Sequence, residues 1–194
     1  MKEKTVNVKK TVIGILIVLL VLFGIWNGLW LYYRQHCFVR VAENAGMTEQ
    51  HDMNTYYLSE VSLENGNIAH YGVFLPHYLR FSHNYSASEE PEKVQIEQDG
   101  KYIHSCDYYI TLSVHPALFG EPRYQIQIYD WKTANEEYLS GKTAELDYGD
   151  IYTFDVDADM NIIRTWSYGG TEIWENAHDE AYAMFIRAKE VFRL

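Results

Sequence analysis

The residues with the clearest metal-ligand spacing lie in the last quarter of the chain. Asp155, Asp157, Asp159 and Asn161 occupy every second position, and oxygen ligands at this spacing can surround a calcium ion in a tight loop. The EF-hand loop also requires a glycine at its sixth position and a carboxylate at its twelfth, where this chain has methionine and tryptophan. Two hypotheses therefore stand for this segment, a calcium site and a simple β-turn over residues 157–161, and we favour the turn.

The histidines form no recognisable zinc motif. The chain has eight of them but neither an HExxH sequence nor a closely spaced cysteine pair, which are the usual zinc signatures. His77 and His83 lie about 20 Å apart if the segment between them is a regular strand, so a shared metal would need a ligand from another strand, such as His70, His104 or His115. No residue can be named as catalytic, and an enzyme site would have to be assembled from dispersed His and Asp residues.

Two cysteines, Cys37 and Cys106, are the only ones in the chain. In an oxidising compartment they are a candidate disulfide, which would close a loop of about 70 residues and stabilise the fold by up to about 4 kcal/mol. The alternative is a buried thiol at Cys106, which precedes an apolar strand face.

A run of 23 residues without a charged side chain spans residues 11–33. As a helix it is about 35 Å long, which is enough to cross the roughly 30 Å hydrocarbon layer of a bilayer. Aromatic side chains cluster at its C-terminal end, where amphipathic rings favour the membrane–water boundary: Trp26, Trp30, Tyr32 and Tyr33. The sequence therefore predicts a single transmembrane helix in contact with the lipid bilayer.

The flanks of this run predict its orientation. Residues 1–10 form a basic tail with four lysines, whereas Arg34 and Arg40 follow the run. The positive-inside rule then places the N-terminus in the cytoplasm and the larger part outside the plasma membrane. A cleaved signal peptide is the competing hypothesis, but the apolar run is longer than a typical signal h-region and no small-residue cleavage motif follows it. We expect an uncleaved signal anchor of a single-pass membrane protein.

Gly24 and Gly28 form a GxxxG pair with Asn27 between them. Small residues four positions apart let two membrane helices approach closely, and a buried Asn can hydrogen-bond across such a contact. These three residues are the candidate surface for homodimer formation through the transmembrane helix.

The charge balance differs across the apolar run. Four of the 16 basic residues and one of the 27 acidic residues precede it, which leaves 12 basic and 26 acidic residues in 34–194. Such a surface repels phosphate backbones, which disfavours nucleic-acid binding, and it attracts cations or a basic partner. Acidity also keeps an exposed domain soluble, without any binding role.

Beyond residue 33 the periodicity predicts a helical stalk over 34–46 and then a β-rich domain over 47–194. Asn65-Gly66 and Asp99-Gly100 have the composition of hairpin turns and lie between alternating segments. Further strands are expected at 78–85, 108–115, 124–131, 151–156 and 161–166, with a polar break at 88–92. An apolar stripe at helical spacing predicts a C-terminal helix over 172–192. The expected fold is a single N-terminal transmembrane helix plus a mainly antiparallel β domain of the α+β class, a sheet or sandwich covered by the C-terminal amphipathic helix.

The aromatic content is the last signal of function. The chain has 17 Tyr and 5 Trp, and exposed rings supply contact area on binding surfaces. Adjacent tyrosine pairs such as Tyr56–Tyr57 and Tyr108–Tyr109 must place one ring on each face of a strand. The leading hypothesis is a membrane-anchored extracytoplasmic binding or interaction module, such as an accessory subunit of a membrane complex, with a protein or cell-envelope partner. The alternative is a small extracytoplasmic hydrolase or metal-dependent enzyme.

Overall fold

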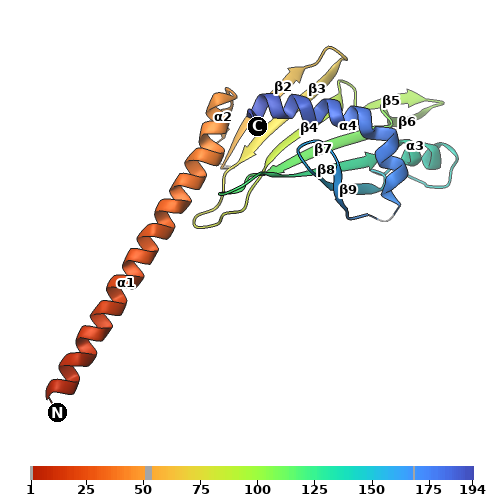
Figure 1. Cartoon of the computed structure of the whole chain (residues 1–194). Helices are drawn as coiled ribbons and strands as arrows, with labels where there is room; N and C mark the ends of the chain where they lie inside the picture. The colour runs from red at the N-terminus through yellow and green to blue at the C-terminus, as the bar shows by residue number, and fades with distance from the viewer. Residues whose placement is uncertain (1, 51–53, 168) are drawn as a thin grey trace.

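The computed structural model describes residues 2–50, 54–167 and 169–194. A single long helical segment leads into a β-rich domain (Figure 1). It consists of α1 (Lys2–Arg34), a π-helical turn η1 (Gln35–Val39) and α2 (Arg40–Asn44). The part from Val8 onward is long and apolar enough, by length and composition, to cross a membrane. Gly46, with φ of +70°, follows the end of the helix, as expected of a residue that can adopt the left-handed conformation.

One antiparallel sheet of eight strands forms the body of the domain, in the order β1-β2-β3-β4-β7-β8-β9-β10. Its strands are β1 (Thr48–Gln50), β2 (Thr55–Ser62), β3 (Asn67–Phe74), β4 (Tyr85–Pro91), β7 (Tyr108–His115), β8 (Arg123–Asp130), β9 (Ile151–Val156) and β10 (Ile162–Thr165). A separate hairpin of β5 (Gln95–Gln98) and β6 (Lys101–His104) projects between β4 and β7. Short connections make this antiparallel order accessible.

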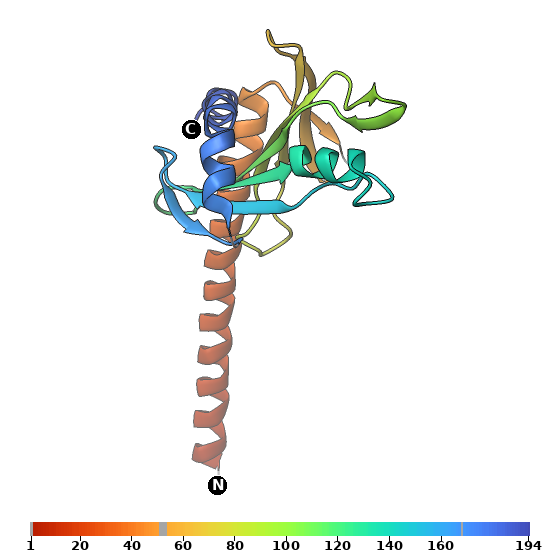
Figure 2. The ribbon, with the colours of Figure 1, turned by 90° about the vertical axis from the view of Figure 1, so that its right-hand side faces the viewer.

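The C-terminal helix α4 (Gly170–Phe192) packs on one face of this sheet (Figures 1 and 2). Its buried stripe is the one that the sequence predicts, and includes Trp174, Ala181, Phe185 and Phe192. These side chains join one hydrophobic core with the inward residues of the central strands, such as Leu112. Full burial of each large apolar side chain stabilises the fold by about 1.5–3 kcal/mol. The expected α+β fold is confirmed, with a sheet rather than a sandwich.

The opposite face of the sheet carries many polar side chains. One cross-strand row is formed by paired residues from six neighbouring strands: Gly72, Ser86, Ser113, Gln125, Asp155 and Arg164. Alternation along each strand sends every second residue to this face. The adjacent tyrosines behave as expected, because Tyr56 is buried in the core whereas Tyr57 is half-buried and contacts Phe74.

Two predicted strand boundaries are wrong. Residues 78–84, expected to lie in a strand, form a loop, and β4 covers Tyr85–Pro91, which includes most of the predicted polar break. The polar residues Ser86 and Ser88 face the open side of the sheet, while Tyr85 and Ala87 are buried beneath α4. Small hydroxyl residues therefore resemble a break in the sequence although they belong to a half-exposed strand.

A short helix, α3 (Trp131–Leu139), follows β8 where no helix was predicted. Asp130 caps its start, with the carboxylate accepting hydrogen bonds from the Thr133 backbone N–H at 3.0 Å and its hydroxyl at 2.7 Å. Asn135 then brackets the backbone of His104 with two hydrogen bonds of 2.9 Å, so that α3 is fixed against β6.

Candidate functional site

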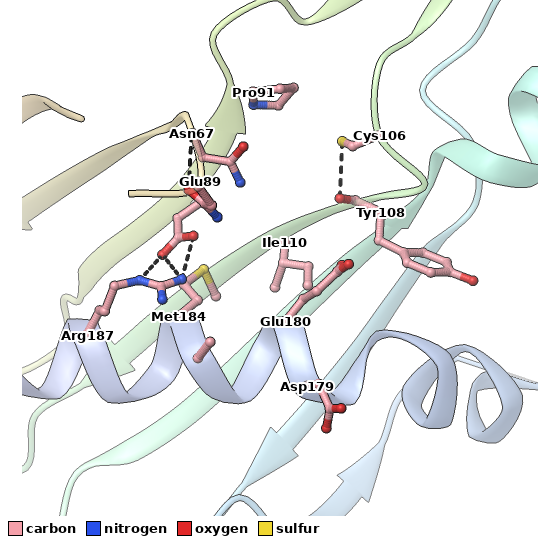
Figure 3. A pocket seen from close by; sticks show the side chains of 12 residues that line it. Asn67, Glu89, Pro91, Cys106, Tyr108, Ile110, Asp179, Glu180, Met184 and Arg187 are labelled. Carbon is pink, nitrogen blue, oxygen red and sulfur yellow. Dashed lines mark hydrogen bonds and ion pairs between the residues drawn. The ribbon is translucent and has the colours of Figure 1, made fainter. Parts of the chain in front are cut away.

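A pocket of about 330 Å³ lies between α4 and the ends of β3, β4 and β7 (Figure 3). It is large enough for a small ligand or for one side chain of a larger partner. Its lining is mixed polar and apolar, and consists of Asn65, Asn67, Glu89, Pro91, Cys106, Tyr108, Ile110, Asp179, Glu180, Ala183, Met184 and Arg187.

A fixed ion pair lies on one side of the pocket. The Arg187 guanidinium donates from Nε to Glu89 Oε1 at 2.7 Å and from Nη2 to Oε2 at 2.6 Å. Glu89 is on β4 at the phase of the buried Tyr85 and Ala87, so its carboxylate points toward α4 and not toward the open face. The two-point geometry makes the pair strong and specific in direction, and Glu89 is thereby neutralised.

The other side of the pocket is acidic. In Figure 3, Glu180 points from α4 toward the space near Ile110 and Tyr108. Asp179 also belongs to the lining, but its exposed carboxylate points to the other side of α4 and lies 3.3 Å from His178 Nδ1. Desolvation and the nearby carboxylate of Asp107 raise the pKa of Glu180. The charged group that acts on Glu180 is therefore another acid, and this side of the pocket favours a positively charged occupant.

Cys106 brings a thiol to the same side. Its Sγ lies 3.4 Å from the carbonyl oxygen of Tyr108. Burial, followed by the charges of Glu180 and Asp107, raises the pKa of Cys106 to about 11. Because the thiolate is the nucleophilic form, Cys106 is protonated and unreactive at neutral pH.

We expect this raised pKa to appear directly in alkylation. In the folded full chain, the rate of Cys106 modification by iodoacetamide should rise about tenfold per pH unit from pH 7 to 9.5 without levelling off, because the thiolate fraction keeps rising toward pH 11. The folded state holds the proton more tightly, so this group's contribution to stability is complete below pH 9 and is lost as pH rises toward 11. Peptide mass spectrometry reads Cys106 separately from Cys37, and the urea-unfolded chain is the control. A plateau near pH 8.5 in the folded chain would contradict the prediction.

The structure does not join the two cysteines as the sequence hypothesis required. Both are free and half-buried. The Cys37 thiol lies 4.0 Å from the carbonyl oxygen of Ala117, just beyond the end of β7, whereas Cys106 precedes the start of β7. The length of this strand separates them by about 25 Å, and a disulfide needs Cα atoms within about 7 Å.

Three of the four candidate calcium ligands, Asp155, Asp157 and Asn161, use their side chains in other hydrogen bonds. Asp155 is buried and accepts from Gln125 Nε2 at 3.1 Å and Trp166 Nε1 at 3.0 Å. Asp157 Oδ1 accepts from the backbone N–H groups of Asp159 and Asn161, both at 2.9 Å. This is the β-turn alternative. Among the residues that the structure describes, no group of three or more His, Cys, Asp or Glu side chains is placed to hold a metal ion.

Two of the histidines lie closer together than the sequence indicated. Because residues 76–84 turn back instead of forming a strand, the rings of His77 and His83 lie 5.6 Å apart between centroids and not about 20 Å. His83 Nδ1 and His115 Nε2 are buried without a hydrogen-bond partner, and burial lowers the pKa of both groups. The other candidates are engaged elsewhere, since His70 Nε2 lies 3.1 Å from Glu90 and His104 stacks on Trp131.

The residues of the GxxxG surface separate into two roles. Gly24 and Gly28 are exposed, and a Cβ at either would meet nothing within 4 Å. Asn27 is used within the chain: its Nδ2 donates to Phe23 O at 2.7 Å and its Oδ1 accepts from the Tyr78 hydroxyl at 2.5 Å. Association through the two glycines stays a prediction, and Asn27 is engaged with its own domain.

The sequence singles out three of the pocket residues, Asn65, Cys106 and Tyr108, but none of them as part of a pocket. Glu89 and Arg187 are 98 positions apart, and only the fold brings them together. One local signal existed, namely an acidic residue at the inward phase of a strand, after Tyr85 and Ala87, which implies a buried partner of opposite charge. Comparison with protein-family models, with curated proteins and with solved structures finds no significant match to this chain.

Proposed function

We propose that the chain is a membrane-anchored extracytoplasmic binding module, and that the pocket beneath α4 takes a positively charged group of a protein or cell-envelope partner. The observation that carries this proposal is the charge distribution of the pocket. Arg187 and Glu89 neutralise each other. The lining then keeps the carboxylates of Asp179 and Glu180, of which Glu180 lies near Asp107, and its only lysine or arginine is Arg187.

The anchor rests on α1. Its apolar run has no charged residue over 11–33. Lysines precede the run, and aromatic residues lie at its C-terminal end. These features support insertion in the plasma membrane with the N-terminus in the cytoplasm and the β-rich domain outside. A module held in this way needs no catalytic group to act, because it keeps a partner at the membrane.

The chemistry of the pocket favours an ammonium or a guanidinium. Residues 34–194 carry an excess of acidic over basic residues, which draws cationic groups toward the domain. Asn67 adds a side-chain amide to the lining, whereas the Asn65 Oδ1 already accepts from the Asn67 backbone N–H at 3.0 Å. A hydrogen bond to a charged group contributes about 1.5–3 kcal/mol, so each carboxylate that contacts the ligand changes affinity about tenfold or more.

The hydrolase hypothesis has no comparable support. The Cys106 thiol is protonated at neutral pH, and Glu89 is held by Arg187 rather than free to act as a base. His77 and His83 lie in the loop before β4, at the other end of that strand from the pocket.

Crosslinking in intact cells tests the binding function. A photo-crosslinking residue in place of Ala183, which is half-buried in the pocket lining, is introduced into tagged full-length protein. We expect one partner to be recovered in stoichiometric amount. The double variant Asp179→Asn/Glu180→Gln should lower its yield about tenfold or more, because two carboxylates are lost.

The control removes the same charge from the same helix. Glu175 and Glu190 are exposed on α4 and do not line the pocket, so Glu175→Gln/Glu190→Gln should leave the yield within about twofold. Equal losses in both double variants would show that only overall charge matters. Recovery of no partner from the parent protein would contradict the binding function itself.

A further inference from the structure

We infer that two loops, residues 76–82 and 116–120, form a bilayer-docking surface that lies in the interfacial layer of the membrane crossed by α1. In Figures 1 and 2 the loop between β3 and β4 lies beside α1, on the side of the domain nearest the N-terminal part of that helix. This inference rests on the membrane anchoring in the proposed function, and goes beyond it by fixing how the domain meets the lipid.

The first docking loop is bound to the end of the apolar run. Trp30 Nε1 donates to the carbonyl of His77 at 3.0 Å, and the rings of Trp30 and Tyr78 meet edge to face at 5.1 Å. The Tyr78 hydroxyl donates to Asn27, and Phe81 packs edge to face on Trp26 at 4.9 Å. The loop therefore contacts α1 over its last turns inside the apolar run.

The second docking loop contacts α1 slightly farther along. The Tyr33 hydroxyl donates to the carbonyl of Pro116 at 2.9 Å, and the Cys37 thiol approaches the carbonyl of Ala117. Tyr33 is only 1% exposed. These contacts hold the domain against the helix directly after the apolar run, so no free stalk separates the domain from the lipid.

The position of α1 in a bilayer sets the depth of both loops. Lys9 and Lys10 mark its inner end, and a hydrocarbon layer of about 30 Å takes up about 20 residues at about 1.5 Å per residue. The outer boundary then falls near Trp30. Tyr78, which reaches back to Asn27, lies at or just below that boundary, and the loop after β7 lies in the headgroup layer.

The composition of the two loops fits this layer. Tyr78 is 62% exposed and Phe119 is 80% exposed, and amphipathic or aromatic rings favour the interface. No acidic residue occurs in 75–88 or in 115–120, although the rest of the domain is rich in acids. Arg80 is exposed in the first loop and suits contact with anionic headgroups.

The turn in the first loop provides a separate argument. The Arg80 N–H donates to the His77 carbonyl at 2.9 Å, and Leu79 has φ of +60°. Glycine or asparagine is the usual residue at such a position, and a leucine there is strained. An apolar side chain at the tip of a turn, against its backbone preference, is what contact with lipid would favour.

Docking in this way also sets the direction of the pocket. β4 leads from the first docking loop to Glu89 and Pro91 in the pocket lining, a distance of about 20 Å along the strand. With the loops in the interface, the pocket beneath α4 is held away from the lipid, where a partner can reach it.

Spin-label accessibility measures this arrangement. Full-length protein with Cys37→Ala/Cys106→Ala receives one cysteine at a time, as Leu19→Cys, Leu79→Cys, Phe119→Cys or Glu64→Cys, and is reconstituted in phosphatidylcholine vesicles that contain phosphatidylglycerol. The ratio of oxygen to nickel-chelate accessibility reports depth. We expect the order Leu19, Leu79, Phe119, Glu64 from deepest to most aqueous, with the ratio at Leu79 several-fold above that at Glu64.

The labels separate the possible failures. A lipid-like ratio at Leu19 together with a ratio at Leu79 equal to that at Glu64 would overturn the docking surface and leave the anchor intact. An aqueous ratio at Leu19 would overturn the anchor as well. Because Leu79→Cys alters a strained turn, Ser82→Cys at an exposed position of the same loop repeats the measurement, and an aqueous ratio there also counts against the proposal.

Discussion

Replacing Phe185 with alanine is expected to lower the free energy of unfolding of the domain by about 3–5 kcal/mol. Phe185 is 1% exposed and its ring packs edge to face on Tyr124 at 5.0 Å. It lies in the middle of the α4 stripe that covers the sheet, so truncation removes a large apolar contact and leaves a cavity that the rigid sheet cannot fill. For a domain of this size the midpoint of thermal unfolding should fall by about 10 °C.

The adjacent residue supplies the control. Ile186 is 36% exposed on the outer side of the same helix. Ile186→Ala also truncates a large apolar side chain to alanine, but it leaves no cavity in the core. Its effect should stay within about 1 kcal/mol. Near-UV circular dichroism of the full chain in detergent, during urea titration, compares the two variants. Equal losses would contradict the packing of α4 on the sheet, because they would place both side chains in similar surroundings.

The main elements could be predicted because each of them has a strong local signal. The apolar stripe of α4 repeats over many turns. The sequence predicts that this helix begins at residue 172, and it begins at Gly170. The two hairpin turns were identified from glycines that do adopt positive φ, +83° at Gly66 and +75° at Gly100. Such patterns survive in the fold because the burial of one face and the geometry of a tight turn depend on few distant contacts.

The missed elements have local signals that tertiary contacts override. β4 contains serines, which suit the open face of the sheet, and glutamates, one of which forms the ion pair. In the sequence this composition is typical of a loop. In α3 only Trp131 and Ala134 are buried. Two apolar positions are too few to give the sequence a recognisable helical periodicity. Residues 78–84 contain the aromatic residues of a strand, yet they form a loop because Tyr78 and Phe81 pack on α1.

The candidate site was beyond prediction for a related reason. Its lining comes mainly from β3, β4, β7 and α4, and the register of the sheet decides that Glu89 faces Arg187. No spacing in the sequence carries that information. The motif-like features, by contrast, were local, and the structure uses Asp157 for a turn and Asn27 for a contact with the domain.

Replacing Gly149 with alanine is expected to have the second large effect, a loss of about 3–5 kcal/mol. Gly149 has φ of +68°, and a Cβ there would lie 2.2 Å from the carbonyl oxygen of Asp130 and 2.8 Å from its carbonyl carbon. Backbone atoms cannot move aside as a flexible side chain can. Asp130 also caps α3 and donates its backbone N–H to Asp150 O at 3.0 Å, so the displaced segment would lose the cap and this contact together.

Gly141 allows the strain of positive φ to be separated from the clash. Its φ is +78°, and a Cβ there would meet nothing within 4 Å. Gly141→Ala should therefore cost only the strain of a left-handed alanine, about 1–2 kcal/mol. Urea unfolding of both variants in the full chain gives the difference, which is the contribution of the close approach to Asp130. A loss for Gly149→Ala no greater than that for Gly141→Ala would mean that the 141–150 segment does not pack against the start of α3, and the position of that helix beside β6 would then have to be revised.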